Sequence, residues 1–108
     1  MPNEYFSFDD YNFVWDEDKN QHNIRKHGVS FRTAAKIFRD DLRIEVVDQK
    51  HSDEELRYDT IGLVDRVLFV VYSERIRKEN ESEIRIISAR PATKQEAQLY
   101  NDLRQGRY

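Results

Sequence analysis

An apolar stretch near the end of the chain, Ile84 to Ile87, most limits how this sequence can fold. Three isoleucines within four positions favour a β-strand, and so continuous a run is typical of a central strand. Pro91 cannot continue a hydrogen-bonded ladder, so we expect the strand to end there. Thr93 and Glu96 have the spacing of a capping box, which predicts a helix directly after it.

The charges at this junction predict an anion-binding site. Arg85, Arg90 and Lys94 occur with no acid between them, and a cationic strand end beside a helix N-terminus favours an anionic ligand. The formal net charge is only -3, but residues 1–18 hold six acids and no Lys or Arg, while residues 19–39 hold six Lys or Arg and no acid. This segregation predicts a local positive surface, although a solvated face on two helices would have the same composition.

Length and composition set the broad class. A chain of 108 residues fits a single domain over residues 1–108. The absence of cysteine excludes disulfides and is typical of a reducing compartment. The acidic N-terminus lacks the basic region of a secretory signal, and the longest apolar run, Val67 to Tyr72, is too short to span a membrane. We therefore expect a soluble, cytoplasmic protein without cofactors.

The order of elements predicts an α+β fold. Residues 1–10 look like a loose acidic lead-in, and the alternation of Tyr11, Phe13 and Trp15 indicates a first strand. Two helices should follow, one between Asp16 and Gly28 and one capped by Ser30. Strands are expected over 42–47, 55–64, 67–73 and 84–90, with a charged loop over 74–83 and a helix after Pro91. We thus predict an antiparallel sheet of four to five strands with two N-terminal helices and one C-terminal helix, mainly on one face.

Several blocks of residues resemble one known family. They are Phe13-Val14-Trp15-Asp16-Glu17, Lys26-His27-Gly28-Val29-Ser30-Phe31, His51-Ser52, Glu55-Leu56-Arg57, Ile61-Gly62, and Arg85-Ile86-Ile87-Ser88-Ala89-Arg90 with Ala92, Thr93 and Glu96. Over about Phe13 to Tyr100 the chain resembles the BrnT family, the toxin half of type II toxin–antitoxin pairs.

The resemblance implies a RelE/ParE-like fold and an endoribonuclease that inhibits translation by cleaving RNA. It also implies neutralisation by a cognate BrnA antitoxin, which carries a ribbon-helix-helix DNA-binding domain. The assembly expected with such a partner is a heterotetramer of two toxins and two antitoxins, with DNA bound through the antitoxin.

RNA cleavage without a metal needs cations for the phosphate and groups that move protons. For the cations we select Arg57 and Arg85, because arginine stays charged and binds phosphate through two donors. For proton transfer we select His27 and Glu55. A purely structural alternative for Arg57 is an ion pair with Glu55 or with an acid across the sheet.

Further cations are candidates for binding RNA or the antitoxin. The RNA-binding candidates are Lys19, Lys26, His51, Arg90 and Lys94, and the antitoxin-binding candidates are Arg32 and Lys36. Strand alternation puts Arg85 opposite the isoleucine face and Arg90 on it, so we expect these two not to converge. His22 and His27 are five residues apart, which does not fit a helical zinc pair, and we predict no metal site.

Two other functions are compatible with the same charges. The chain could be a non-enzymatic binding module whose basic face holds an acidic segment of a partner. Because the ParE branch of the same fold acts on gyrase, a DNA-directed activity is a third, weaker reading.

Overall fold

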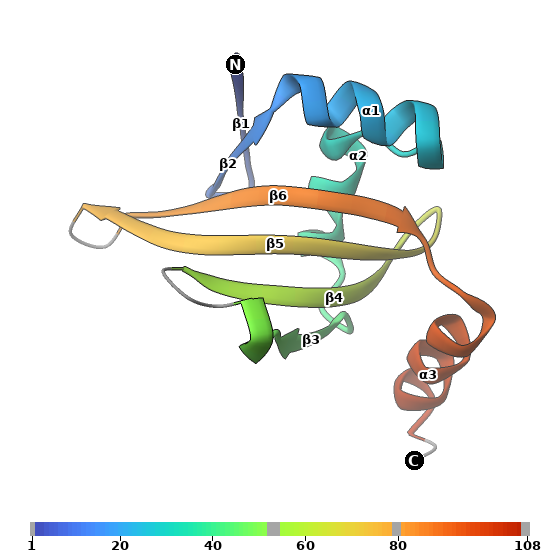
Figure 1. The fold of residues 1–108 in the computed structure, drawn as a ribbon. Coiled ribbons are helices and arrows are strands. Elements are labelled where there is room, and N and C mark those ends of the chain that lie inside the picture. Colours follow the sequence, from blue (N-terminus) through green and yellow to red (C-terminus); the bar gives the residue numbers. More distant parts are fainter. Residues whose placement is uncertain (1, 52–54, 79–80, 107–108) are drawn as a thin grey trace.

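The computed structural model describes residues 2–51, 55–78 and 81–106, apart from the side chains of His51, Arg77 and Lys78. It contains one six-stranded sheet in the order β1-β2-β6-β5-β4-β3 (Figure 1). The elements in chain order are β1 (Asn3–Phe8), β2 (Tyr11–Asp16), α1 (Glu17–His27), α2 (Phe31–Ala35), the 3₁₀ helix η1 (Lys36–Arg39), β3 (Ile44–Val47), the 3₁₀ helix η2 (Gln49–His51), β4 (Leu56–Val64), β5 (Arg66–Lys78), β6 (Glu81–Pro91) and α3 (Lys94–Arg104).

The predicted central strand is confirmed as β6. It lies between β2, to which it runs parallel, and β5, to which it runs antiparallel. The strand ends at Pro91, and Thr93 and Glu96 form the capping box that starts α3. The proline and the cap therefore fix where the sheet ends and the last helix begins.

The predicted acidic lead-in is wrong, because residues 3–8 form β1 and pair with β2 along their whole length. Asp9 and Asp10 make the turn between them with positive φ angles of 50° and 68°. This backbone matches the tight hairpin turn that aspartate tolerates. Phe6 and Phe8 then pack against the core from one side of β1.

The predicted loop over 74–83 is also wrong. β5 runs on to Lys78 and β6 already begins at Glu81, with paired residues as far as Lys78 opposite Glu81. Most residues at this end of the two strands are charged and Ile76 is exposed, so the hairpin extends beyond the core. The sheet therefore has six strands rather than four to five, and it is mixed because β2 is parallel to β6.

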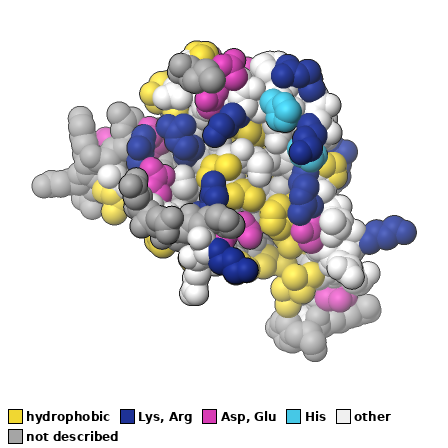
Figure 2. Space-filling view, viewed as in Figure 1, with side chains coloured by type: hydrophobic (Ala, Val, Ile, Leu, Met, Phe, Trp, Pro, Cys, Tyr) yellow, Lys and Arg dark blue, Asp and Glu magenta, His cyan; other side chains and the backbone are white. Residues whose placement is uncertain are grey.

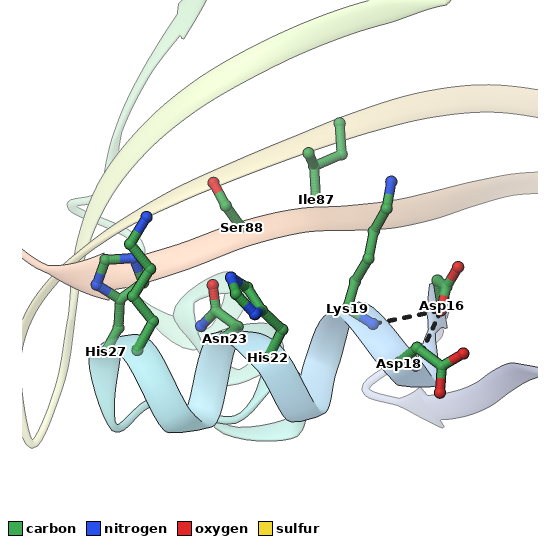
Figure 3. A pocket seen from close by; sticks show the side chains of 9 residues that line it. Asp16, Asp18, Lys19, His22, Asn23, His27, Ile87 and Ser88 are labelled. Carbon is green, nitrogen blue, oxygen red and sulfur yellow. Dashed lines mark hydrogen bonds between the residues drawn. The ribbon is translucent and has the colours of Figure 1, made fainter.

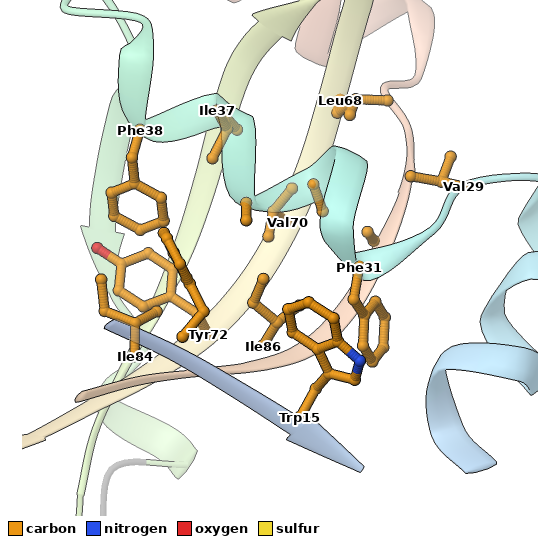
Figure 4. Packing of buried hydrophobic residues seen from close by; sticks show 14 residues of the cluster. Trp15, Val29, Phe31, Ile37, Phe38, Leu68, Val70, Tyr72, Ile84 and Ile86 are labelled. Carbon is orange, nitrogen blue, oxygen red and sulfur yellow. The ribbon is translucent and has the colours of Figure 1, made fainter. Parts of the chain in front are cut away.

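The hydrophobic core lies between one face of the sheet, the core face, and the segment formed by α2 and η1. The apolar residues of this segment are buried: Phe31, Ala34, Ala35, Ile37 and Phe38. Figure 4 shows Phe31, Ile37 and Phe38 against Trp15, Val70, Tyr72 and Ile86 of the sheet. Ser30 caps α2 by accepting from the Thr33 N–H at 3.0 Å, as expected.

α1 is held by buried asparagines rather than by an apolar stripe. Asn23 Nδ2 donates to the carbonyls of Ala89 at 2.7 Å and Val29 at 2.9 Å, and Asn23 Oδ1 accepts from the Ala89 N–H at 3.2 Å. β2 pairs with β6 only at Ile84 and Arg85, so the edge of β6 beyond them is left for α1. Asn23 thus takes the place of a neighbouring strand.

The sheet face opposite α2, here called the open face, is turned towards the viewer in Figure 1. α1 borders it along β6, and α3 borders it at the other side. Glu96 of α3 binds Arg90 on this face, and the Tyr100 hydroxyl donates to Asp40, which also accepts from the Leu63 N–H at 2.8 Å. The helices therefore do not gather on one face as predicted, and the open face stays accessible between α1 and α3.

Candidate functional site

Two of the predicted cations lie in one row on the open face. Ser73 of β5 is opposite Arg57 of β4 on one side and opposite Arg85 of β6 on the other. Directly opposed residues project from the same face of a sheet, so the three side chains lie next to one another. We call Arg57, Ser73 and Arg85 the arginine row. Ser73 is only 5% exposed, whereas both arginines are half-buried.

Two acids and a third arginine lie along one side of this row, each two positions along the chain from a member of the row. Ser73 Oγ donates to Glu55 Oε2 at 2.8 Å, and an Arg75 guanidinium nitrogen lies 3.5 Å from the other oxygen of Glu55. Arg75 also binds Glu83 Oε1 at 3.0 Å, and Glu83 is only 3% exposed. The row therefore sits beside a hydrogen-bonded acid rather than in a purely cationic surface.

A β-bulge brings Arg90 to the open face, contrary to the simple alternation predicted. Ile86 is opposite Tyr72 and Ser88 is opposite Val71, so Ile87 is the extra residue. The bulge reverses the alternation for every later residue of β6.

Arg90 therefore shares a face with Arg85, but it is already occupied by a second partner. Its guanidinium forms two hydrogen bonds with Glu96, at 2.8 and 3.0 Å, and lies 4.2 Å from the centre of the Phe69 ring. Side-chain hydrogen bonding from Arg90 holds the pKa of Glu96 below its ordinary value. Arg90 thus anchors α3 to the sheet.

A cavity of about 410 Å³ lies between α1 and the bulge, and we call it the α1 cavity. Ile87 and Ser88 line it from β6, and Asp16 and Asp18 line it at the start of α1. The other lining residues come from one side of α1: Lys19, His22, Asn23, Lys26 and His27. Figure 3 shows the lysine and histidine side chains pointing from α1 towards the strand.

The α1 cavity and the arginine row are neighbours along β6. Ser88 lies three positions after Arg85, and the histidines therefore flank the row from the side opposite Glu55. Figure 2 shows Lys and Arg side chains around apolar surface in this view, with the histidines at its upper right. Such an arrangement suits an extended anion with apolar groups, held by charge and by surface contact.

Comparison with known proteins identifies the family of the chain. The family described as "Ribonuclease toxin, BrnT, of type II toxin-antitoxin system" matches residues 15–96. The chain belongs to the BrnT family. The matched segment contains the arginine row, Glu55, the bulge and all of α1, whereas β1 lies before it.

A solved relative has a similar fold. The chain matches the 1.1 Angstrom-resolution crystal structure of the Brucella abortus ribonuclease toxin, BrnT, with 26% identity and a TM-score of 0.54. The match covers 74% of this chain and 94% of that chain. No curated protein gives a match.

The remaining candidates of this BrnT-family chain lie apart from the row. Lys94 is exposed at the start of α3, and the side chain of His51 is outside the described residues. Arg32 and Lys36 are exposed on α2 and η1, and the Arg32 guanidinium lies 4.5 Å from the centre of the Phe6 ring. The basic segment 19–39 is therefore divided between the α1 cavity and the helical layer, and does not form one surface.

Three residues near the row were missed from the sequence. The predicted loop over 74–83 includes Arg75. The spacing of two between Ser73 and Arg75 instead indicates a strand on which both side chains point to the same face. Ser73 and Ser88 carried no charge pattern, and only their register places them beside Arg85 and His27.

Two further features concern the parts of the chain that the structure describes. Within residues 2–51, 55–78 and 81–106, no group of three His, Asp or Glu side chains is placed to hold a metal ion. No described helix is both long and apolar enough to cross a membrane.

Proposed function

We propose that this BrnT-family chain is a metal-independent endoribonuclease that cleaves RNA at the arginine row. The observation that carries the proposal is the alignment of Arg57 and Arg85 across β4, β5 and β6, with Glu55 on one side of the row and the α1 cavity on the other. Two fixed positive charges on one surface suit the phosphate of a reacting backbone.

The proposed reaction is an internal transesterification. The 2′-oxygen of one nucleotide gives up its proton and bonds to the adjacent phosphorus. The bond from that phosphorus to the 5′-oxygen of the next nucleotide breaks, and this oxygen takes up a proton. The products are a 2′,3′-cyclic phosphate and a 5′-hydroxyl, so the step needs neither water nor an oxidant.

Glu55 and His27 are the proposed proton-transfer pair. The attacking and leaving oxygens lie on opposite sides of the phosphorus, so an acid and a base are needed on opposite sides. Glu55 is bound to Ser73, and His27 lines the cavity with Ser88, which is opposite Val71. Glu55 and Ser88 are offset by four residues along the strands and by two strands across the sheet, which together make about 16 Å, a span that two side chains and a nucleotide can bridge.

Lys19 and Lys26 are proposed to hold neighbouring phosphates in the α1 cavity. Lys94 and the solvent-facing side of Arg90 would extend this track towards α3, and His51 is a further proposed RNA contact. Because Arg90 is already bound to Glu96, its contribution should be smaller than that of Arg85.

The proposed partner is a BrnA-type antitoxin with a ribbon-helix-helix domain, in an assembly of two toxins and two antitoxins that binds DNA through the antitoxin. Family membership supports an antitoxin partner. Arg32 and Lys36 are the proposed contacts for an acidic antitoxin segment, and their exposure supports this role. Charge reversal at both should abolish antitoxin binding without removing RNA cleavage, and unchanged binding would reject these contacts.

The deciding experiment incubates purified, antitoxin-free protein with a defined RNA in EDTA, with and without ribosomes, and determines the ends of the products. Cyclic-phosphate ends in EDTA support the proposal. No cleavage in either reaction overturns it in favour of the binding-module reading, and cleavage that needs an added divalent ion overturns metal independence.

Variants test the site within the same assay. Arg57→Ala with Arg85→Ala should reduce cleavage at least about 100-fold, because positioned charge stabilises the transition state. Arg66→Ala is the matched control, since Arg66 is exposed at the start of β5 and lies outside the row. Full cleavage by the double variant would reject the arginine row as the site of cleavage, and the family membership would be unaffected.

A further inference from the structure

The arginine row continues across the two strands on the other side of β6. Arg85 is opposite Val14 of β2, and Val14 is opposite Tyr5 of β1. Because opposed residues share a face, Tyr5 belongs to the same face as Arg85 and Arg57. One line of side chains therefore crosses five of the six strands.

The neighbours of Tyr5 confirm which way it points. Phe6 packs towards the core, with its ring 6.1 Å from that of Trp15 and 6.2 Å from that of Phe13. Successive side chains of a strand point to opposite faces, so Tyr5 points away from the core. It is 63% exposed, whereas Val14 beside it is 1% exposed.

Tyr5 is an aromatic side chain without a partner in the described part of the chain. It makes no hydrogen bond, ring contact or cation contact with any residue that the structure describes. Its backbone is nevertheless fixed, because β1 pairs with β2 from Asn3 to Phe8 and is anchored by Phe6 and Phe8. An exposed tyrosine ring on a paired strand presents a flat apolar surface, and ordering it against a ligand fixes only two side-chain torsions.

We propose that Tyr5 is a stacking platform for a base of single-stranded RNA, next to the phosphate bound at the arginine row. Two strand spacings separate Tyr5 from Arg85, about 10 Å, so a nucleotide close to that phosphate reaches the ring. Aromatic stacking accepts any base, and it is commonly combined with a cationic track for the backbone. The ligand class is therefore a nucleobase adjoining the cleaved bond.

This inference deepens the proposed function and rests on it. β1 lies outside the residues that match the BrnT family, 15–96, so the platform adds a contact to the matched part of the chain. The proposal predicts that Tyr5 contacts a base of the RNA, whereas the arginine row contacts the phosphates through charge alone.

The test measures affinity for a short single-stranded RNA in which every 2′-hydroxyl is methylated, so that the proposed transesterification is blocked. A second oligonucleotide has the same number of phosphates but lacks bases. The variants are Tyr5→Ala, Tyr5→Leu, which keeps apolar bulk, and Tyr5→Phe, which keeps the ring. Ile76→Ala serves as the control, because Ile76 is also highly exposed on a strand but lies outside the row.

Tyr5→Ala and Tyr5→Leu should bind the base-containing RNA at least about five-fold more weakly, and Tyr5→Phe should stay within about two-fold of the unmodified protein. All Tyr5 variants should bind the base-free oligonucleotide like the unmodified protein. Thermal unfolding verifies that each variant is folded. Tyr5→Ala and Tyr5→Leu both lack the ring, so the same weakening in both assigns the effect to the lost ring.

The outcomes separate this inference from the function it rests on. If the unmodified protein binds RNA but Tyr5→Ala binds it equally well, the platform is rejected and the ribonuclease proposal stands. If Tyr5→Ala weakens binding of both oligonucleotides equally, the effect is not stacking and the platform is again rejected. If the unmodified protein neither binds nor cleaves RNA, both proposals fail.

Discussion

At the scale of single residues, the hydroxyl oxygen of Thr60 allows a test of how a single buried polar atom affects the stability of the core. Thr60 is fully buried on the core face of β4, and among the described residues its Oγ1 is a buried side-chain atom without a hydrogen-bond partner. An unpartnered buried hydroxyl costs roughly 1–3 kcal/mol. Thr60→Val should therefore raise the free energy of unfolding by about 1 kcal/mol, measured by thermal or urea unfolding.

Thr33→Val is the matched control for this change. Thr33 Oγ1 accepts a hydrogen bond from Ser30 Oγ at 3.0 Å, so removing the hydroxyl should lower stability. If Thr60→Val destabilised the protein as much as Thr33→Val, the Thr60 hydroxyl would have a partner in solution.

Glu96 provides a pH-dependent test at the same scale. The bound Arg90 guanidinium lowers the pKa of Glu96 from its ordinary value of 4.5. A lowered pKa contributes stability that is present above pH 4.5 and is lost as the pH falls through the folded-state value. Glu96→Gln keeps a side chain suited to the capping box but removes the charge.

The Glu96→Gln variant should be less stable than the unmodified protein at pH 7, by at most about 1 kcal/mol because the pair is partly exposed. The difference should disappear in acid, once the glutamate is protonated in both states. Urea unfolding across pH 3 to 8 measures it. A difference that stayed constant with pH would assign the effect to the cap rather than to the charge.

At the scale of elements, α1 depends on a side-chain amide. Asn23→Ala would leave the N–H and C=O of Ala89 and the C=O of Val29 without their partner. The expected loss is roughly 2–4 kcal/mol, seen in urea unfolding together with faster hydrogen exchange of the Ala89 amide. Gln21→Ala, on the exposed side of the same helix, should change stability by less than about 0.5 kcal/mol. Equal losses from both variants would show that α1 is not held through Asn23.

The elements that the sequence predicted well are those defined by local chemistry. Asp16, Ser30 and Thr93 cap the three helices as expected, and Gly28 ends α1 with a positive φ of 72°. A cap depends on backbone groups two or three residues away, so a short stretch of sequence contains the whole interaction.

The elements that were missed depend on distant partners. β1 is polar apart from its aromatic residues, and it becomes a strand because β2 is available to pair with it. The bulge at Ile87 arises between β5 and β6, and nothing in Ile84 to Arg90 alone distinguishes a bulge from regular alternation. Regular alternation, which takes no account of the bulge, predicts Arg90 on the core face, whereas the structure has it on the open face.

At the scale of the whole molecule, the sequence supplies candidate residues for the site but not their geometry. Arginine chemistry led to the choice of Arg57 and Arg85 as candidates, whereas their alignment through Ser73 depends on the order of three strands. The reach of the same line to Tyr5 depends on two more strands, one of them parallel, which no local pattern indicates. Register therefore determines which of the many charged residues act together.

The distribution of charge over the molecule leads to a final prediction about salt. The net charge of -3 alone would disfavour RNA, so the RNA binding that we propose requires local cations such as those of the open face. If Arg57, Arg85, Lys19 and Lys26 each contact a phosphate, the affinity for single-stranded RNA should fall as the salt concentration rises. The expected slope of log affinity against log salt concentration is about -3. Titrations of the methylated RNA over a salt series measure this slope.

Arg85→Ala should reduce the size of that slope by about 0.7, because one phosphate contact is lost. Arg66→Ala removes an equal charge from an exposed position outside the row and should leave the slope unchanged. The pair therefore separates a contact at the row from a general change in net charge. Equal slopes for the two variants would mean that RNA responds to the overall charge and that the open face is not its binding surface.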